Sequence, residues 1–340
     1  MEGNRAVNRG EKSPHQSAVE APSTSYPALI VDGTAGKRGM TETLAALLRW
    51  TGDRGQAVAI ASELSQCVSE AGFEPDGRVA IFDDCAALVQ DRGRVGGIAP
   101  GLVLCLGGDG ALLSAVRRFH ELQLPFLGVN LGSVGFNASV APQDLIETLE
   151  AWEAGETDET GHMTLQVRLL RAGEEVARGM AINEASIHRE LDARMLDIDV
   201  RQGDTDVLSC HADGLIVATP TGSTAYNLSA GGPILHPSLE CLVVTGLGAH
   251  TLSNRSIVLP VDRPLILQAH CRSSASVSGK ARSVAALILD GQERWTLLEG
   301  DRIEVGKGPD LLRLIRPKGT DYFATLRAKL NWNVPIKPPR

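Results

Sequence analysis

The sequence predicts an α/β domain built on a parallel sheet, followed by a β-rich domain. From about residue 27 to residue 160, short apolar runs that suit buried strands alternate with segments of helical hydrophobic spacing. Beyond residue 161 the pattern changes to β-branched, alternating runs, such as Thr164–Leu170 and Val176–Ile187. Alternating strands and helices place helices on both faces of a sheet, so we expect the first domain to be Rossmann-like.

The expected elements of the first domain follow one another regularly along the chain. The strands are Ala28–Val31, Val58–Ile60, Leu102–Leu106 and Pro125–Val129, and the helices are Thr41–Trp50, Asp84–Gln90, a segment after Gly110, and Pro142–Trp152. Open parallel sheets bind ligands at the carboxyl ends of their strands, so the loops that follow these strands are the candidate site.

Shifts in composition divide the chain into four regions. Residues 1–26 are polar and have no apolar period, so they are expected to form a disordered tail. The α/β domain is expected at residues 27–160 and the β-rich domain at residues 161–310. The last region, residues 311–340, is expected to return to the first domain.

The overall composition is that of an ordinary globular protein with two domains. The 340 residues are 43% hydrophobic and 22% charged, which is enough to bury a sizeable core. A formal net charge of −8 argues against nucleic acid as a partner, because binding to its backbone needs clustered Lys and Arg. No stretch reaches the roughly 20 apolar residues of a membrane helix, and no signal peptide or Cys-x-x-Cys pair is present. We therefore expect a cytoplasmic protein with reduced cysteines and no membrane contact.

The junction between a strand and a helix at Gly107–Gly110 predicts a phosphate site. The apolar strand Leu102–Leu106 leads directly into this Gly-Gly-Asp-Gly segment. Free backbone N–H groups at a helix N-terminus favour an anion, and glycines let a phosphate approach closely. A carboxylate beside phosphates is repelled unless it takes a proton, faces a metal or orients a hydroxyl, so Asp109 indicates phosphoryl transfer. A plain turn is the alternative interpretation of this short motif.

Three further segments place glycines or polar side chains at strand ends. Gly128–Phe136 is a second glycine-rich loop after a strand, and Asn183 and Glu184 follow the apolar approach Gly179–Ile182. The segment Thr219–Asn227 gathers hydroxyl side chains that can bind the ribose and amide groups of a nucleotide. A structural loop and a solvated strand end are the alternatives for the first two segments.

Taken in order, these motifs resemble those of the NAD kinases, which phosphorylate the 2′-hydroxyl of the adenosine ribose of NAD. The resemblance covers about residues 27–330. It rests on Gly107–Gly110, on Asn130 with Gly132, Gly135 and Phe136, on Asn183-Glu184, on Asp213-Gly214 with Thr219–Tyr226, and on His250–Ser253. Gly-Gly-Asp-Gly alone is shared with lipid kinases and phosphofructokinases. The resemblance implies the NAD kinase-like two-domain fold, with the site in the cleft between the domains.

The resemblance also implies roles for the phosphate loop. Asp109 would be the catalytic residue that positions or deprotonates the ribose hydroxyl. Gly107, Gly108 and Gly110 would admit the phosphates of the donor, which is ATP or polyphosphate. The implied cofactor is Mg²⁺, and no protein ligand for it is assigned. Residues 33–37 do not form a P-loop, so the metal is expected to neutralise more of the phosphate charge.

The remaining implied residues would bind NAD. Asn183 and Glu184 would hold its ribose and adenine, and Asp213 its nicotinamide amide. The two ends of the dinucleotide would be lined by Phe136, Thr221, Thr224, Ala225 and Tyr226. The family resemblance also implies a homodimer or homotetramer.

The chain departs from the usual family motifs at three positions. Ala111 stands where Thr is usual, Asn137 where Leu is usual, and Ser256 where Pro is usual. A non-catalytic, regulatory NAD-binding homologue and a lipid kinase of the diacylglycerol type are therefore kept as alternatives. Asp290–Gln292 is interpreted as a hairpin turn, and His188 is given no metal-binding role because it lacks a suitably spaced partner.

Overall fold

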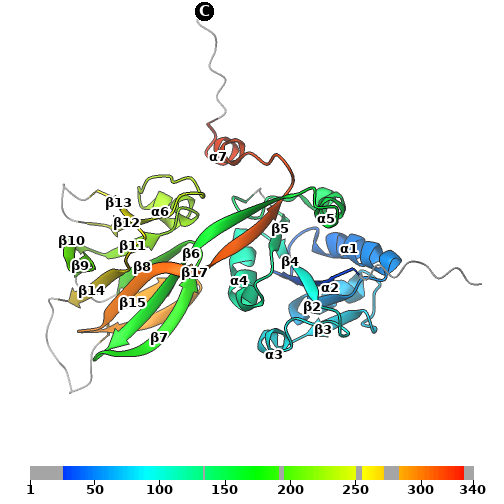
Figure 1. Cartoon of the computed structure of the whole chain (residues 1–340), viewed down its shortest axis with the longest axis horizontal. Helices are drawn as coiled ribbons and strands as arrows, with labels where there is room; N and C mark the ends of the chain where they lie inside the picture. The colour runs from blue at the N-terminus through cyan, green and yellow to red at the C-terminus, as the bar shows by residue number, and fades with distance from the viewer. Residues whose placement is uncertain (1–25, 133–134, 191–194, 250–254, 272–282, 333–340) are drawn as a thin grey trace, which may run out of the picture.

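The structure is a computed structural model that describes residues 26–132, 135–190, 195–249, 255–271 and 283–332. The expected tail up to residue 25 and the motif residues 250–253 lie outside the described residues. Two lobes are joined by the long strands β6 (Asp158–Arg171) and β17 (Arg302–Arg316), which run side by side between them (Figure 1).

The first lobe is a parallel sheet with helices on both faces, as predicted. Its strands are ordered β5-β4-β1-β2-β3. They are β1 (Ala28–Gly33), β2 (Val58–Ala61), β3 (Val79–Phe82), β4 (Pro100–Gly107) and β5 (Phe126–Asn130). The helices are α1 (Met40–Arg54), η1 (Ser62–Leu64), α2 (Ser65–Glu70), α3 (Cys85–Gln90), α4 (Asp109–Phe119), η2 (His120–Leu122), η3 (Pro142–Asp144) and α5 (Leu145–Glu153).

Strand β1 shows why the sheet needs helices on both sides. All six of its residues are buried, and successive side chains point to opposite faces. Leu29 and Val31 belong to the core that contains residues of α1, α2 and α5, whereas Ile30 belongs to the core that contains residues of α4. An apolar run without alternation therefore becomes the centre of a three-layer lobe.

The second lobe consists of antiparallel strands in two sheets, with a large apolar core formed by residues from both. One sheet is ordered β13-β12-β11-β8-β15-β16, and the other contains β10, β9, β14, β17, β6 and β7 before it continues into the first lobe. The bounds are β7 (Glu174–Ala181), β8 (Glu184–Arg189), β9 (Leu196–Gln202), β10 (Thr205–Ala212), β11 (Gly214–Ala218), β12 (Cys241–Leu247), β13 (Ile257–Pro260), β14 (Leu265–Cys271), β15 (Ser283–Leu289) and β16 (Glu293–Leu298).

The predicted continuous run Val176–Ile187 is in fact divided. Strand β7 ends at Ala181 and pairs with β6, while β8 starts at Glu184 and belongs to the other sheet. The backbone N–H groups at the break are bound by a carboxylate from elsewhere in the chain, which stabilises the crossing between sheets. The sequence marks the break only by the polar pair Asn183-Glu184, which follows the apolar residues Gly179–Ile182.

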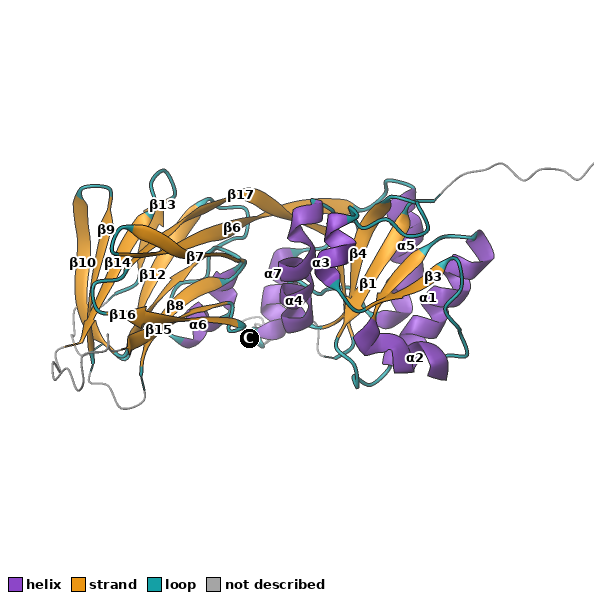
Figure 2. Cartoon of the chain, turned by 90° about the horizontal axis from the view of Figure 1, so that it is seen from below, coloured by secondary structure: helices purple, strands orange, loops and turns teal. Residues whose placement is uncertain are grey.

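Strand β17 connects the two lobes. It pairs with β6 along most of its length and with β5 in parallel at Leu314 and Phe126. After β17, the helix α7 (Tyr322–Lys329) lies over the junction of the lobes, and Figure 2 shows this junction from below. The second lobe adds η4 (Gly222–Thr224) and α6 (Tyr226–Ser229). Within the described residues, no helix has the length and apolar character needed to cross a membrane.

Candidate active site

The predicted phosphate loop, Gly107–Gly110, lies at the N-terminus of a helix, as the sequence predicts. Strand β4 ends at Gly107, Gly108 is in an extended conformation with a φ of −146°, and α4 begins at Asp109. No side chain caps the helix, so the N–H groups of its first turn face outward without intrahelical acceptors. A Cβ on Gly107 would lie 2.5 Å from the Cβ of Ala111. Ala111, which stands where the family motif usually has Thr, therefore packs directly against the loop.

Asp109 joins the two glycine-rich loops. Its Oδ2 accepts the N–H of Phe136 at 2.8 Å, and its Oδ1 accepts those of Asn137 at 2.9 Å and Ala138 at 2.8 Å. A Cβ on Gly135 would lie 2.2 Å from Asp109 Oδ1. Asn137 contributes its backbone here, so the contact does not depend on its side chain.

A cavity of about 240 Å³ opens at this loop. It is lined by Gly107, Gly108, Asp109, Asn130, Gly132, Gly135 and two lysines, Lys37 and Lys329. Lys37 lies in the loop after β1, which the sequence did not identify as a phosphate loop, and Lys329 lies in the last turn of α7. Sequence reasoning missed both lysines because neither occupies a recognised motif.

The hairpin turn at Asp290 holds the predicted nucleotide residues Asn183 and Glu184. Its carboxylate accepts the N–H groups of Ile182 at 2.8 Å, Asn183 at 2.7 Å and Glu184 at 3.0 Å. The prediction of a turn is confirmed, because β15 and β16 meet there, but the turn also shapes the site. In the sequence, the pair Asp290-Gly291 is the feature that indicates this turn.

Contacts from α4 bring the Asp290 turn to the phosphate loop. Arg117 of α4 places Nη2 3.8 Å from Asp290 Oδ2 and also pairs with Glu293. Gln292, in the same turn, donates from Nε2 to the carbonyl oxygen of Gly110 at 3.1 Å. The phosphate loop of the first lobe and the Asn183-Glu184 segment of the second lobe therefore belong to one constellation.

Asn183 and Glu184 present buried polar atoms to the site. Asn183 Oδ1 and Glu184 Oε2 are buried and have no hydrogen-bond partner among the described residues. Burial, together with the nearby charge of Asp290, raises the pKa of Glu184 to about 8. The carboxyl group is therefore protonated at neutral pH and able to donate a hydrogen bond. Buried unsatisfied atoms of this kind suit a polar ligand.

The predicted hydroxyl-rich loop packs against Asn183. Thr219 donates its N–H to Asn183 O at 2.9 Å, and a Cβ on Gly222 would lie 2.0 Å from the same oxygen. Thr224 donates from its hydroxyl to Thr221 O at 3.2 Å, and Ala225 lies between η4 and α6.

Thr221 is also tied to a buried histidine that the sequence did not single out. His162 Nδ1 lies 2.9 Å from Thr221 Oγ1, and His162 Nε2 lies 3.0 Å from Thr160 Oγ1. Burial, aided by the charges of Arg316 and His236, lowers the pKa of His162 to about 3, so the imidazole is neutral. A neutral imidazole has one donor and one acceptor nitrogen, which matches its two hydroxyl partners.

Asp213 lies away from this cluster, at the opposite end of β8 and β11. Gly214, beside it, pairs with His188, whereas Ala218 at the other end of β11 pairs with Glu184. These four residue steps separate the two ends by about 13 Å. The ring of Tyr226 stacks on His188 with centroids 5.8 Å apart, and Asp213 Oδ1 lies 2.5 Å from Arg189 Nε. The predicted NAD residues therefore form an extended row.

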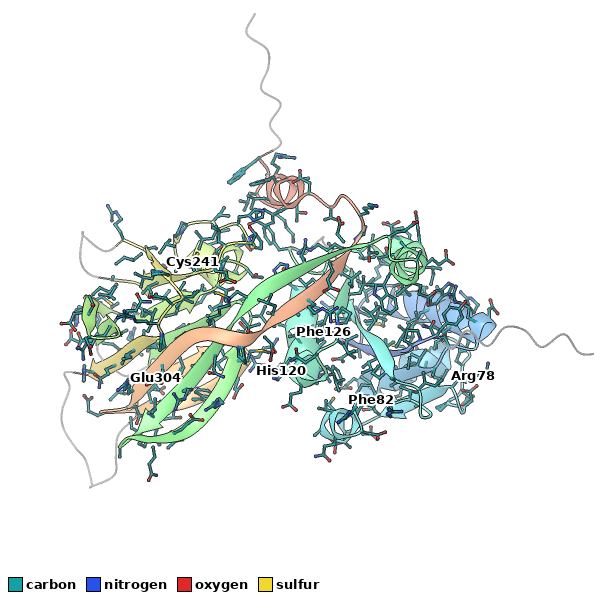
Figure 3. All side chains as sticks on the ribbon, viewed as in Figure 1. Arg78, Phe82, His120, Phe126, Cys241 and Glu304 are labelled. Atoms are coloured by element: carbon teal, nitrogen blue, oxygen red, sulfur yellow. The ribbon has the colours of Figure 1, made fainter. Side chains whose placement is uncertain are left out.

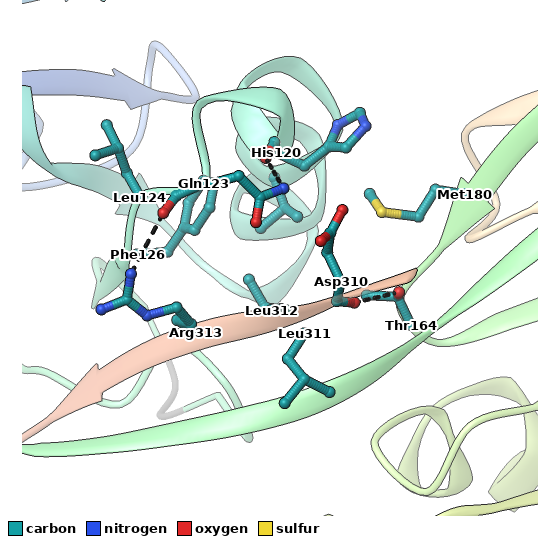
Figure 4. A pocket seen from close by; sticks show the side chains of 11 residues that line it. His120, Gln123, Leu124, Phe126, Thr164, Met180, Asp310, Leu311, Leu312 and Arg313 are labelled. Carbon is teal, nitrogen blue, oxygen red and sulfur yellow. Dashed lines mark hydrogen bonds between the residues drawn. The ribbon is translucent and has the colours of Figure 1, made fainter. Parts of the chain in front are cut away.

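Other cavities near the lobe junction differ in size. Figure 3 shows His120 and Phe126 at this junction, and Figure 4 shows a cavity beside them, between α4 and β17. Its volume is about 20 Å³, which suits a water molecule at most. A cavity of about 400 Å³ lies next to His162, Arg316 and Tyr322.

Comparison with known proteins decides the family. The model of the ATP-NAD kinase N-terminal domain matches residues 98–157, and that of the C-terminal domain matches residues 182–317. The chain is 40% identical to an NAD kinase of Geobacter sp. strain M21 over 231 residues, which cover 68% of this chain and 77% of that protein. The chain belongs to the NAD kinase family. An NAD kinase of Geobacter sulfurreducens is 38% identical, with coverage of 80% and 93%.

Solved structures support the same fold. Yeast NADH kinase complexed with NADH matches with a TM-score of 0.79 and 19% identity, covering 94% of this chain and 91% of that chain. An NAD kinase of Archaeoglobus fulgidus in complex with ATP matches with a TM-score of 0.62 and 21% identity, covering 90% and 99%. The two-lobed arrangement is thus the fold of NAD kinases, as the sequence predicts.

The last departure from the NAD kinase motifs lies in a hydrogen-bond network. Ser256 Oγ is 2.8 Å from Thr245 Oγ1, which is also 2.7 Å from Asn227 Oδ1. Asn227 in turn donates to the carbonyl oxygens of Ser223 and Pro233. Ser256 therefore joins a network that anchors the end of the hydroxyl-rich loop.

Proposed function

We propose that this chain is an NAD kinase that transfers the terminal phosphoryl group of ATP to the 2′-hydroxyl of the adenosine ribose of NAD, forming NADP. The observation that carries the proposal is Asp109, whose carboxylate stands at the open N-terminus of α4 and lines the cavity of the glycine loops. Membership in the NAD kinase family supports the same chemistry.

Asp109 is proposed to act on the acceptor hydroxyl. The ribose oxygen forms a bond to the terminal phosphorus, the bond from that phosphorus to the bridging oxygen breaks, and ADP leaves. Asp109 either accepts the hydroxyl proton or orients the hydroxyl while its proton passes to an oxygen of the transferred phosphoryl group. Three backbone N–H groups already bind the carboxylate and hold it in one orientation, which suits a role in positioning the hydroxyl. Oδ2 accepts one N–H in the structure, which leaves a lone pair for the substrate.

Asn183 and Glu184 are proposed to hold the adenosine part of NAD. The unpartnered Asn183 Oδ1 accepts from an amino or hydroxyl group, and protonated Glu184 donates to a ribose oxygen. Thr221, Thr224 and Ala225 follow the end of β11 that lies beside Glu184, and they are proposed to continue this row of NAD-binding residues. Phe136, whose N–H is bound by Asp109, supplies an apolar wall next to the reacting hydroxyl.

The nicotinamide end is proposed to lie toward Asp213. The separation of Asp213 from Glu184 by the length of β11 suits a dinucleotide, whose two nucleosides are far apart when extended. Tyr226, stacked on His188, lies in the row between the ends. This arrangement favours NAD over a lipid, because a lipid acceptor lacks a second polar group that could bind at the far end of the row.

Mg²⁺ is proposed to enter with the donor. Near the phosphate loop the cavity offers one carboxylate, Asp109, and the amide of Asn130, and no group of three acidic, His or Cys ligands occurs among the described residues. This donor set fits an ion bound mainly by phosphates and water. When bound, the ion would offset phosphate charge.

We also propose that the enzyme is a cytoplasmic homo-oligomer that supplies NADP. Free thiols are found at Cys67, Cys85, Cys105, Cys210 and Cys241, which suits a reducing compartment.

The test is an assay of the purified chain with ATP, Mg²⁺ and either NAD or NADH. Product is detected through a dehydrogenase specific for NADP. NADP formation supports the kinase and ranks its two acceptors. If no product forms with ATP or polyphosphate while calorimetry shows NAD binding, the chain is a regulatory homologue and the proposal is wrong.

A further inference from the structure

We propose that Lys329, in the last turn of α7, is a phosphate-binding residue for the donor, and that it acts with Lys37 on the rim of the same cavity. The inference rests on the proposed kinase function and deepens it. Both lysines line the cavity formed by Gly107, Gly108 and Asp109, although they come from opposite ends of the described chain.

The two lysines are available for a ligand. Among the described residues, Lys307 forms an ion pair with Glu240, but neither Lys37 nor Lys329 forms one. The nearest carboxylate in the cavity lining, that of Asp109, already accepts three backbone N–H groups. Lys37 is exposed and Lys329 is half-buried, so neither ammonium group is enclosed away from an incoming ligand.

The charge of the cavity requires such residues. Its lining contains one carboxylate, and the N-terminus of α4 contributes only about half a positive charge. Without the lysines, the lining of the cavity would therefore supply no net positive charge to attract a polyphosphate. With them, two positive charges stand against one negative charge, and an ammonium group can donate hydrogen bonds to phosphate oxygens.

The surroundings of Lys329 fix its place beside the reacting groups. Its Nζ lies 5.9 Å from the centroid of the Phe136 ring, and Arg316 Nη2 donates to Phe136 O at 3.2 Å. Phe136 also donates its N–H to Asp109. Lys329 thus faces the residue that the catalytic carboxylate holds directly.

Helix α7 is anchored to the second lobe at its other end. Asp321 caps the helix by accepting the N–H of Phe323 at 2.8 Å, and the Tyr322 hydroxyl donates to Leu235 O at 3.3 Å. The rings of Tyr322 and Phe323 pack against His236. The helix therefore carries a cation from an anchor in the second lobe to the phosphate cavity of the first.

The experiment compares Lys329→Ala, Lys329→Gln and Lys329→Arg in the full chain. The matched control is Arg327→Ala, since Arg327 is exposed on the same helix and pairs with Asp321 at its start. KM for ATP, KM for NAD and kcat are measured, together with the calorimetric affinity for inorganic tripolyphosphate. Thermal unfolding checks that each variant is folded, and Lys329→Gln, which keeps most of the side-chain length, serves if Lys329→Ala does not fold.

Loss of the ammonium group should raise KM for ATP and the Kd for tripolyphosphate by at least about 10-fold, the effect of one hydrogen bond between charged groups. KM for NAD should change less than about twofold, because Asn183 and Glu184 are untouched. Lys329→Arg should restore most of the phosphate affinity, and Arg327→Ala should behave as the wild type.

Two results would overturn the inference. Unchanged tripolyphosphate binding in Lys329→Gln shows that the side chain does not contact phosphate. Equal weakening of ATP and NAD binding shows that the residue only positions α7. If the wild type makes no NADP but binds tripolyphosphate in a Lys329-dependent manner, the phosphate site stands and the proposed kinase function fails.

Discussion

The Oδ2 atom of Asp109 accepts the backbone N–H of Phe136 at 2.8 Å, across 27 positions of the chain. This bond fixes the second glycine-rich loop against the first. The proposed catalytic carboxylate would therefore have two tasks, which are to orient the acceptor hydroxyl and to hold the loop that forms the wall of its pocket.

Replacing Asp109 with Asn should separate these tasks. An amide oxygen can still accept the N–H groups of Asn137 and Ala138, but its NH₂ group then faces the N–H of Phe136. We expect kcat to fall by about 10² to 10⁴-fold through loss of the carboxylate. The donor-to-donor contact should lower the free energy of unfolding by about 1–3 kcal/mol. NADP formation and urea unfolding measure the two effects, and wild-type turnover would contradict the assignment.

Gly135→Ala should be among the most damaging small changes. The new Cβ would lie 2.2 Å from Asp109 Oδ1, so the carboxylate or the loop must move. We expect a loss of kcat of about 10²-fold, the cost of displacing a catalytic group by around 1 Å. Gly52→Ala in α1 is the control, because nothing lies within 4 Å of its added Cβ and helix propensity should rise by about 0.5–1 kcal/mol. Similar kinetics in both variants would show that the Gly135 contact is unimportant.

Asp290→Ala should disrupt the nucleotide side of the site. The N–H groups of residues 182–184 lose their common acceptor, so we expect a loss of about 2–4 kcal/mol in stability and at least about 10-fold in kcat/KM for NAD. The matched control is Asp301→Ala, in the turn before β17, where the carboxylate binds Leu298 N–H and Arg171. The control should lose stability but keep its kinetics. A kinetic loss in the control would trace the effect to general destabilisation.

Glu184 should make the protein less stable as pH rises. Its pKa is about 8 in the folded chain against an ordinary value of 4.5, so the folded state holds a proton that the unfolded state has lost between these values. Stability therefore falls with increasing pH across this window, by at most about 1.4 kcal/mol for each pH unit. Glu184→Gln, which imitates the neutral form, should flatten this slope in urea unfolding at pH 5.5 and pH 8. An unchanged slope would exclude Glu184 as its source.

His162 should make the protein less stable as pH falls below neutral. Its folded pKa is about 3, whereas the ordinary value is 6.5, so the unfolded state binds a proton that the folded state refuses. Stability conferred by neutral His162 is complete above pH 6.5 and declines as pH falls toward 3. Thermal unfolding from pH 7 to pH 4.5 should show a smaller decline in His162→Gln than in the wild type. Equal declines would assign the acid sensitivity to other groups.

The sequence by itself determined the elements whose signals are local. An apolar run without alternation predicted β4, and the glycines that follow it predicted a phosphate-binding loop where α4 begins. The change to β-branched, alternating runs indicated the β-rich lobe, and the ordered motifs indicated the family. These features depend on residues adjacent in the chain or three to four positions apart, where backbone geometry fixes which side chains share a face.

Tertiary structure decided the contacts between distant segments. The acceptor for residues 182–184 is Asp290, more than 100 positions away, and Lys329 reaches a cavity whose glycines lie more than 190 positions earlier. The break between β7 and β8 depends on that same acceptor. A local pattern shows that a backbone N–H or a phosphate needs a partner, but the partner is chosen by how the two lobes pack, since only packing sets which distant side chains meet.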